Sequence, residues 1–362
     1  MKVLNILNPV ERGGGESMLM DLLTEKRVGI HEEVVLVSKC EYLTEQFDIM
    51  GINYKEIPFN IKNIPSSSKF KKLFNAFVQI IWLLANYRYL KRFDVTILHS
   101  FPIHFFSALL KNCVIVKHSV VGNKKLVNRF FAFFFRKAHK VIGVGPAVVQ
   151  SLDAYYEIKS TEVWNPVASE YFDAPQLPSC EDDEEINLVH VGRLVHGKNQ
   201  ALSIRACSRL QEQTGKRVNL HIVGHGELET ELKEIARDYS NIKVNFCGRL
   251  DKSEIINLVD KCDVGLLPSS AEGFGIAAAE YVIRSKPVVG LLESGLHNIF
   301  GNVGVFTTAE TLDTAILDAI QLAKKVEFSD AVSLMKERLS VSSVKDRYIG
   351  IYEEACGPIL KS

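Results

Sequence analysis

The chain has 362 residues, of which 47% are hydrophobic and 24% are charged, and its 43 basic side chains equal its 43 acidic ones in number. This length exceeds that of one ordinary domain and predicts two, each with a hydrophobic core of its own. The average composition excludes disordered and fibrous proteins.

The charge is unevenly divided along the chain. Residues 1–165 contain 22 Lys/Arg and 14 Asp/Glu, whereas residues 166–362 contain 21 and 29. A basic first half can lie against anionic lipid or bind a phosphorylated acceptor, and two oppositely charged halves can also simply attract each other. We expect no nucleic-acid partner, because such binding would need a denser basic surface.

The cysteines and the apolar runs bear on the cellular compartment. The seven cysteines are scattered and never spaced as C-x-x-C, which predicts buried thiols in a reducing compartment rather than disulfides or a zinc site. Val3–Leu7 reads as a strand with no secretory signal before it, so we expect a cytoplasmic protein. The longest apolar stretch, Leu73–Tyr87, is too short to cross a membrane.

Short apolar runs alternate with helical stretches through both halves. In the first half they predict strands at Val3–Leu7, Val34–Val37, Val95–Leu98, Val114–Val116 and Val141–Val144. In the second half they predict strands at Ile186–Val191, Val218–Val223, Val244–Cys247, Val264–Leu267 and Pro287–Gly290. This alternation predicts two α/β domains with parallel sheets, which bind ligands beyond the carboxyl ends of their strands.

These runs predict the domain boundaries. We expect an N-terminal Rossmann-like domain at residues 1–165, a proline-containing acidic linker at 166–185 and a second Rossmann-like domain at 186–342. The last segment, 343–362, has apolar residues at helical spacing. This predicts an amphipathic C-terminal helix, which can pack on either domain.

A glycine-rich turn, Gly13-Gly14-Gly15-Glu16, follows the first strand. Glycines let the backbone approach a ligand, and the helix that follows offers unpaired N–H groups to a phosphate. The turn lacks the Lys-Ser/Thr of a P-loop and the spacing of a dinucleotide fingerprint, and it can also be an ordinary turn.

Basic side chains follow the first strand of the second half, in Gly192–Asn199. Arg193 can hold phosphate oxygens with its planar fork, and Lys198 adds a mobile charge near a helix start. Together they predict a diphosphate site that needs no metal, although both can also be solvated surface charges.

Two carboxylates follow the strand Val264–Leu267 eight positions apart. Glu272 lies in a glycine-flanked loop, Glu272-Gly273-Phe274-Gly275, and Glu280 lies in the first turns of the next helix. Charged carboxylates there can accept hydrogen bonds from sugar hydroxyls, or they can be the ordinary acids of a helix start.

Histidines follow two strands of the first half. His118 comes after Val114–Val116 and can hydrogen-bond a sugar or balance charge at a reacting carbon. His99 follows Val95–Leu98 and is the weaker candidate. Either histidine can also be purely structural.

Taken together, these motifs resemble the retaining glycosyltransferases of family 4, which have the GT-B fold of two Rossmann-like domains facing across a cleft. The resemblance runs through nearly the whole chain in the right order. It is carried by the glycine turn, His118, Gly192-Arg193 with Lys198, Gly224-His225-Gly226, Gly248-Arg249, Glu272-Gly273-Phe274-Gly275 and Glu280.

The resemblance implies roles for these residues. Arg193 and Lys198 would bind the donor diphosphate, Glu272 the sugar hydroxyls and Glu280 the ribose. Gly14 and Gly15 would line the diphosphate, and His118 would contact the sugar near its reactive carbon. The remaining donor-binding positions would be Gly192, Gly224, Gly248, Arg249, Gly273, Phe274 and Gly275.

The resemblance also implies a reaction. A hexose-type sugar would pass from a nucleoside-diphosphate sugar to a glycan or lipid-linked glycan, with retention of configuration and with neither metal nor cofactor. Bacterial surface polysaccharide synthesis is the expected setting, and the C-terminal helix would pack on the N-terminal domain. The sequence departs from the family at Ser119, Ser285, Asn298 and the order Asn165-Pro166, which leaves the sugar preference open.

Two basic and aromatic segments, Lys69–Arg92 and Arg129–Lys137, predict peripheral contact with an anionic membrane, although core helices with solvated ends have the same pattern. Two other functions remain alternatives. One is a nucleotide-sugar epimerase of the same architecture, and the other is a protein that binds sugar nucleotides without catalysis.

Overall fold

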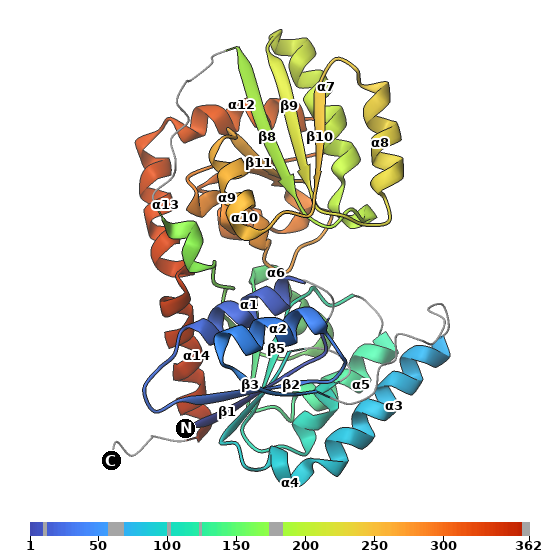
Figure 1. Cartoon of the computed structure of the whole chain (residues 1–362), viewed down its shortest axis with the longest axis vertical. Coiled ribbons are helices and arrows are strands. Elements are labelled where there is room, and N and C mark those ends of the chain that lie inside the picture. The colour runs from blue at the N-terminus through green and yellow to red at the C-terminus, as the bar shows by residue number, and fades with distance from the viewer. Residues whose placement is uncertain (10–12, 57–68, 100–102, 123–124, 174–183, 357–362) are drawn as a thin grey trace. The chain divides into compact units, whose positions relative to one another are not determined.

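The structure is a computed structural model that describes most of the chain in two compact units (Figure 1). Unit 1 contains residues 1–166 and 341–362, and unit 2 contains residues 167–340. The described residues are 1–9, 13–56, 69–99, 103–122, 125–173 and 184–356, without the side chains of 69–76 and 125–127.

Unit 1 contains a parallel sheet of seven strands in the order β3-β2-β1-β4-β5-β6-β7. Its strands are β1 Lys2–Leu7, β2 His31–Leu36, β3 Asn53–Glu56, β4 Val95–Leu98, β5 Cys113–Lys117, β6 Lys140–Gly143 and β7 Thr161–Glu162. The strands predicted in the first half are confirmed as β1, β2, β4, β5 and β6. Their apolar side chains are almost fully buried, as in a parallel sheet covered on both faces.

The helices of unit 1 connect these strands. They are α1 Gly14–Thr24, α2 Glu41–Met50, α3 Lys69–Ala85, α4 Tyr87–Leu90, the 3₁₀ helix η2 Ile103–Ala108, α5 Lys125–Phe135, α6 Pro146–Tyr156 and α14 Val341–Cys356. Helix α1 begins within the predicted glycine turn, and its N-cap Gly13 makes no side-chain capping bond. Its first N–H groups therefore donate no hydrogen bond to an N-cap side chain.

Unit 2 contains a parallel sheet of six strands in the order β10-β9-β8-β11-β12-β13. They are β8 Glu185–Val191, β9 Arg217–Val223, β10 Lys243–Gly248, β11 Val264–Leu267, β12 Val288–Leu291 and β13 Gly304–Thr307. All but β13 were predicted. Since β8 and β11 are neighbours, the loops that follow them meet at one edge of the sheet.

The main helices of unit 2 pack on this sheet around a core of buried aliphatic residues. They are α7 Gln200–Thr214, α8 Glu229–Asp238, α9 Lys252–Asp260, α10 Ile276–Ile283, α11 His297–Phe300, α12 Leu312–Ala323 and α13 Val326–Leu339. The described part of unit 2 also contains the 3₁₀ helices η3 Ser169–Phe172, η4 His196–Lys198 and η5 Leu292–Ser294.

Part of the segment expected as a linker is packed on unit 2. Arg284 and Asp260 are each 2% exposed and form a buried ion pair of 2.5 Å. The same guanidinium donates to the carbonyl oxygens of Tyr171, at 3.0 Å, and of Asp173. Residues 174–183 of the expected linker lie outside the described residues.

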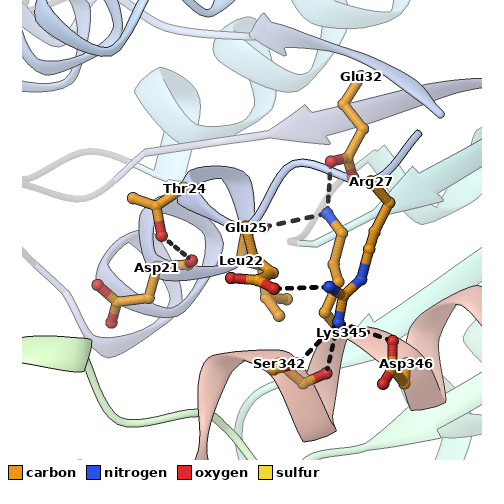
Figure 2. Close-up of polar contacts among 9 residues, drawn as sticks. All are labelled: Asp21, Leu22, Thr24, Glu25, Arg27, Glu32, Ser342, Lys345 and Asp346. Atoms are coloured by element: carbon orange, nitrogen blue, oxygen red, sulfur yellow. Dashed lines mark hydrogen bonds and ion pairs between the residues drawn. The ribbon is translucent and has the colours of Figure 1, made fainter. Parts of the chain in front are cut away.

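Helix α14 packs within unit 1, although unit 2 precedes it in the chain (Figure 1). Lys345 is 1% exposed, donates to Leu22 O at 3.0 Å and pairs with the carboxylate of Glu32. Beside it Arg27 donates to Asp346 Oδ1 at 2.9 Å (Figure 2). The expected C-terminal helix therefore begins at Val341, and residues 357–362 lie outside the described part.

Two further sequence expectations concern membrane-spanning helices and the cysteines. No helix in the described part of the chain is both long and apolar enough to span a bilayer. No cysteine of the described residues forms a disulfide. Cys40, Cys113, Cys207 and Cys262 are buried as predicted, whereas Cys247 is only partly buried and Cys356 is exposed, which corrects the prediction for these two. Burial raises the pKa of the Cys262 thiol to about 12, so this thiol stays protonated at neutral pH.

Candidate active site

Glycines bring the loops after β8 and β9 into direct backbone contact. Gly224 has a φ of +133°, and a Cβ there would lie 2.0 Å from Gly192 O. A Cβ on Gly226 would lie 2.3 Å from Leu194 O. Three hydrogen bonds join the loops, Gly192 N to Val223 O at 2.9 Å, Leu194 N to His225 O at 3.0 Å and Leu228 N to Leu194 O at 3.1 Å. Glycine is therefore required here by close backbone packing, whatever a ligand needs.

The loop after β8 is also tied to the loop after β11. Asn199, with a φ of 56°, donates from its amide to Pro268 O at 2.8 Å and to Ser270 Oγ at 3.0 Å. Gln200 donates to Arg193 O at 2.9 Å. These hydrogen bonds fix the backbone on both sides of Lys198, which limits the positions that its side chain can take.

Lys198 and Glu272 meet across these two loops. Lys198 Nζ lies 2.5 Å from Glu272 Oε1, and the two side chains are only 24% and 12% exposed. The amide N–H of Glu272 donates to Ser294 O at 3.3 Å, which holds the acid in its loop. The sequence predicted that a cation and an acid converge on one ligand, and the structure brings this pair together.

Arg193 and Glu280 lie near this pair in the chain but differ in their surroundings. Arg193 is exposed, and its guanidinium forms no ion pair within the part of the chain that the structure describes. It is therefore available to an anionic ligand. Glu280 is partly buried on α10, whose N-cap Gly275 has a φ of 81°.

Phe274 and Ser285, two positions noted in the sequence, have structural roles. Phe274 is 2% exposed, and its ring lies 5.9 Å from that of Phe300, so its side chain belongs to the core. Only its backbone can reach a ligand. Ser285, noted as a departure where the family often has glycine, has a φ of 60°, a conformation that favours glycine.

Arg249 follows β10 and contacts the loop after β9. Its guanidinium contacts both ring nitrogens of His225, since Nε donates to Nδ1 at 2.7 Å and Nη2 lies against Nε2. Gly248, with a φ of 63°, precedes it. The carboxyl ends of β8, β9, β10 and β11 and the loops after them thus carry the predicted residues of unit 2, apart from Glu280 on α10.

His190 was not singled out by the sequence, because it stands inside an apolar strand run. It is fully buried, and its Nδ1 lies 2.9 Å from Ser203 Oγ. Burial, with a smaller effect of the charge on Lys198, lowers the pKa of His190 to about 3. A neutral histidine therefore lies under the basic loop, and its Nε2 has no partner among the described residues.

In unit 1 the glycine turn and His118 are adjacent. A Cβ on Gly15 would lie 3.6 Å from the His118 ring, so glycine leaves this ring open to the turn. Both ring nitrogens of His118 are buried and lack a hydrogen-bond partner in the described residues. Burial, and then the charge on Lys117, lowers the pKa of His118 to about 4. The imidazole is therefore neutral at physiological pH.

His99 packs against the ring of His118. Their rings stack with centroids 5.7 Å apart, and His99 Nε2 lies 3.0 Å from Asn5 Oδ1. His99 is 3% exposed, and burial lowers its pKa well below the ordinary value. Gly14, Gly15 and His118 thus form one set in unit 1, and the other predicted site residues form a second set in unit 2.

No three His, Cys, Asp or Glu side chains of the described residues lie close enough together to hold a metal ion.

Residues 178–332 match the family model described as glycosyl transferases group 1. This region of the chain, within unit 2, is a group 1 glycosyltransferase region. The matched segment contains Arg193, Lys198, Glu272 and Glu280, so the second set of site residues lies wholly within the group 1 region.

Individual proteins agree with this assignment. An uncharacterized glycosyltransferase of Methanocaldococcus jannaschii is 25% identical over 255 residues, which cover 66% of this chain and 67% of that protein. The amylovoran biosynthesis glycosyltransferase of Erwinia amylovora is 29% identical over 147 residues, covering 37% of this chain and 36% of that enzyme.

A solved structure extends the similarity to the whole fold. An Anabaena protein in complex with UDP and glucose has a TM-score of 0.74 at 18% identity, covering 97% of this chain and 98% of that one. The chain therefore has the GT-B fold predicted from its motifs.

Proposed function

We propose that this group 1 glycosyltransferase moves a hexose-type sugar from a nucleoside-diphosphate sugar to a glycan or lipid-linked glycan. The observation that carries the proposal is the contact between Lys198 and Glu272, 2.5 Å apart at the carboxyl ends of β8 and β11. A diphosphate attracts the ammonium, and sugar hydroxyls donate to the carboxylate, so one donor molecule satisfies both groups.

The cations act on the leaving group. The planar guanidinium of Arg193 binds two phosphate oxygens at once, and Lys198 adds a second positive charge. Both stabilise the nucleoside diphosphate as negative charge develops on it, which lowers the barrier to departure. Protein side chains thus supply the positive charge, and we propose that the reaction needs neither metal nor cofactor.

We propose retention of configuration by attack on the face from which the diphosphate leaves. The acceptor oxygen bonds to the anomeric carbon as the carbon–phosphate-oxygen bond breaks, and the acceptor proton passes to the departing phosphate. In unit 1 the neutral His118 hydrogen-bonds the transferred sugar, and Gly14 and Gly15 line the diphosphate with backbone N–H groups. In unit 2 Glu280 holds the ribose, and backbone groups of Gly192, Gly224, Gly248, Gly273 and Gly275 complete the donor site beside Arg249.

The acceptor side of the proposal is a growing surface glycan at the cytoplasmic face of a bacterial membrane. The name of the amylovoran relative supports a role in polysaccharide biosynthesis, and the basic excess of residues 1–165 supports a phosphorylated or membrane-bound acceptor.

A radiolabelled donor tests the reaction. The protein should release a nucleoside diphosphate and label an acceptor glycan only when the acceptor is present, with the anomeric configuration kept as read by NMR. A new nucleotide sugar formed from the donor alone would assign an epimerase instead. Donor binding without turnover, over a full panel of acceptors, would assign a protein that binds sugar nucleotides without catalysis.

A further inference from the structure

One long segment of unit 1 is almost free of acidic residues. Residues 57–152 contain a single one, Asp94, whose carboxylate accepts a hydrogen bond from Lys2 N at 2.7 Å. The same segment contains fifteen basic residues: Lys62, Lys69, Lys71, Lys72, Arg88, Lys91, Arg92, Lys111, Lys117, Lys124, Lys125, Arg129, Arg136, Lys137 and Lys140. The described parts of this segment include the helices α3, α4, η2 and α5 and the strands β4, β5 and β6.

Helix α3 exposes an apolar stripe. Phe77, Ile81 and Leu84 are 59%, 50% and 51% exposed and lie at the i, i+4, i+7 spacing of one helix face. On the opposite side Leu83 is fully buried and Gln79 is 3% exposed, so the helix already packs on unit 1 through its other face. The apolar stripe therefore stays exposed to solvent in the folded unit.

Helix α5 repeats this arrangement. Phe130 and Phe133 are 55% and 53% exposed, whereas Ala132 and Phe135, on the other face, are 2% exposed. Lys137 Nζ lies 5.6 Å from the centre of the Phe133 ring, so a cation accompanies the exposed aromatic side chain.

The two stripes belong to one flank of unit 1, where Figure 1 shows α3 and α5 as neighbours. Both helices contact η2, and Phe105 of η2 lies 5.8 Å from Phe130 and 4.8 Å from Phe134, centre to centre. Leu109, just after η2, is 46% exposed. We call this flank the α3/α5 surface, made of Phe77, Ile81, Leu84, Leu109, Phe130 and Phe133.

Exposed cations accompany the apolar residues. Arg88, Lys111, Arg129 and Lys137 are exposed on or beside the same elements, and none has a carboxylate partner among the described residues. Large exposed apolar side chains next to cations without a carboxylate partner fit a binding partner that has an apolar interior and a negatively charged surface.

We propose that the α3/α5 surface is the site at which this protein docks on a bilayer rich in anionic lipid. The aromatic and aliphatic side chains enter the boundary between headgroups and acyl chains, and the cations bind lipid phosphates. The inference deepens the proposed function and rests on it for one point only, because a lipid-linked acceptor would lie in that membrane.

Vesicle flotation tests the proposal with the full chain. Wild-type protein should float with vesicles of phosphatidylcholine and phosphatidylglycerol, float poorly with phosphatidylcholine alone and be released by salt. Arg129→Glu with Lys137→Glu, and separately Phe130→Ser with Phe133→Ser, should each weaken binding about tenfold or more.

Unit 2 offers matched controls. Val326 and Leu334 are 74% and 50% exposed, and Lys324 and Lys325 are exposed beside them. Val326→Ser with Leu334→Ser, and Lys324→Glu with Lys325→Glu, should leave flotation unchanged. Thermal denaturation of all four variants checks that each is folded; only Phe130→Ser with Phe133→Ser should lower the midpoint, because the Phe130 ring contacts Phe105.

Several results would overturn the proposal: no salt-sensitive flotation of the wild type, equal losses in the unit 2 controls, or self-association through the α3/α5 surface without lipid binding. Thermal stabilisation by nucleoside diphosphates, measured in parallel, separates the two ideas. Stabilisation without flotation removes the docking surface alone, whereas flotation without stabilisation by any nucleotide or nucleotide sugar removes the proposed function alone.

Discussion

Lys198 and Glu272 neutralise each other in the structure, and both are largely shielded from solvent. A bound donor must therefore compete for each of them. The diphosphate offers Lys198 more negative charge than one carboxylate does, and the released Glu272 can then accept hydrogen bonds from the sugar. Donor binding would replace one internal ion pair by two contacts to the ligand.

The substitution Glu272→Gln removes the charge while keeping the size of the side chain. We expect transfer to fall by about 10² to 10³, since a charged hydrogen bond to the sugar is lost. The unfolding midpoint should stay within a few degrees, because the amide oxygen of Gln can still accept a hydrogen bond from Lys198. Steady-state kinetics and thermal denaturation measure the two effects.

The exposed Glu293, also after a strand of unit 2, provides the control. Glu293→Gln should behave as wild type in both assays. Wild-type turnover by the Glu272→Gln variant would show that this carboxylate does not act on the donor.

Some properties of single residues were readable from the sequence and others were not. The motif around Glu272 singled out the loop that contacts Lys198, but it did not reveal that the Phe274 side chain lies in the core. His190 was missed because it stands in an apolar strand run, and the sequence does not show that the charge of Lys198 acts on it. The sequence showed that Ser285 stands where glycine is frequent. The structure shows a positive φ at Ser285, which is the backbone conformation that favours glycine.

The paired loops after β8 and β9 depend on a glycine at 224. The substitution Gly224→Ala places a methyl group 2.0 Å from Gly192 O at a φ of +133°, so the backbone must shift. We expect a loss of about 2–4 kcal/mol in the free energy of unfolding, measured by urea titration. Nucleotide binding should weaken as well, because the same shift moves Arg193.

Gly197 lies in the same loop region and gives a matched control, because a Cβ there meets no atom within 4 Å. Gly197→Ala should leave stability unchanged or slightly raised. Equal losses in both variants would mean that the contact between the loops is not what requires glycine.

Helix α14 is held by a buried ammonium. The substitution Glu32→Ala leaves Lys345, 1% exposed, without its carboxylate partner, so we expect a loss of about 3–5 kcal/mol. Lys345→Met should cost less, because it removes the buried charge and keeps an apolar stem of similar length. Urea unfolding of the two variants tests this order.

The exposed pair between Lys140 and Glu354 is the comparison on the same helix. Its side chains are 31% and 58% exposed, so Glu354→Ala should have little effect on stability. If Glu354→Ala were as harmful as Glu32→Ala, burial would not be the source of the difference.

Strands were predictable where both faces of the sheet are covered, because their residues form continuous apolar runs. The edge strand β3 was missed since its sequence, Asn53-Tyr54-Lys55-Glu56, is polar. The two-residue β7 is too short for any periodicity. The meeting of Lys198 and Glu272 depends on β8 and β11 being neighbours, and the order of strands in a sheet is not written in the pattern of one chain.

Buried histidines in both units predict a common response to acid. Burial lowers the pKa of His104 and of His190 to about 3 and that of His118 to about 4. The unfolded chain, with pKa values near about 6.5, takes up more protons in this range. The free energy of unfolding should be fully present above about pH 6.5 and should fall as the pH drops toward these folded-state values.

Urea midpoints measured between about pH 7.5 and pH 5 test this response. His104→Gln should flatten the decline, whereas substitution of the exposed His139 by Gln should leave it as in wild type. A midpoint that stays constant or rises over this range would contradict the expectation.

The packing of α14 in unit 1 bears on how the molecule is made. During synthesis the strands of unit 1 leave the ribosome first, yet Tyr348 and Tyr352, which are buried in that unit, arrive almost last. Unit 2 is one continuous stretch and can complete its core in the meantime. We expect the second unit to mature before the first, and a gene fragment ending at residue 166 to yield a polypeptide that lacks part of its own interior.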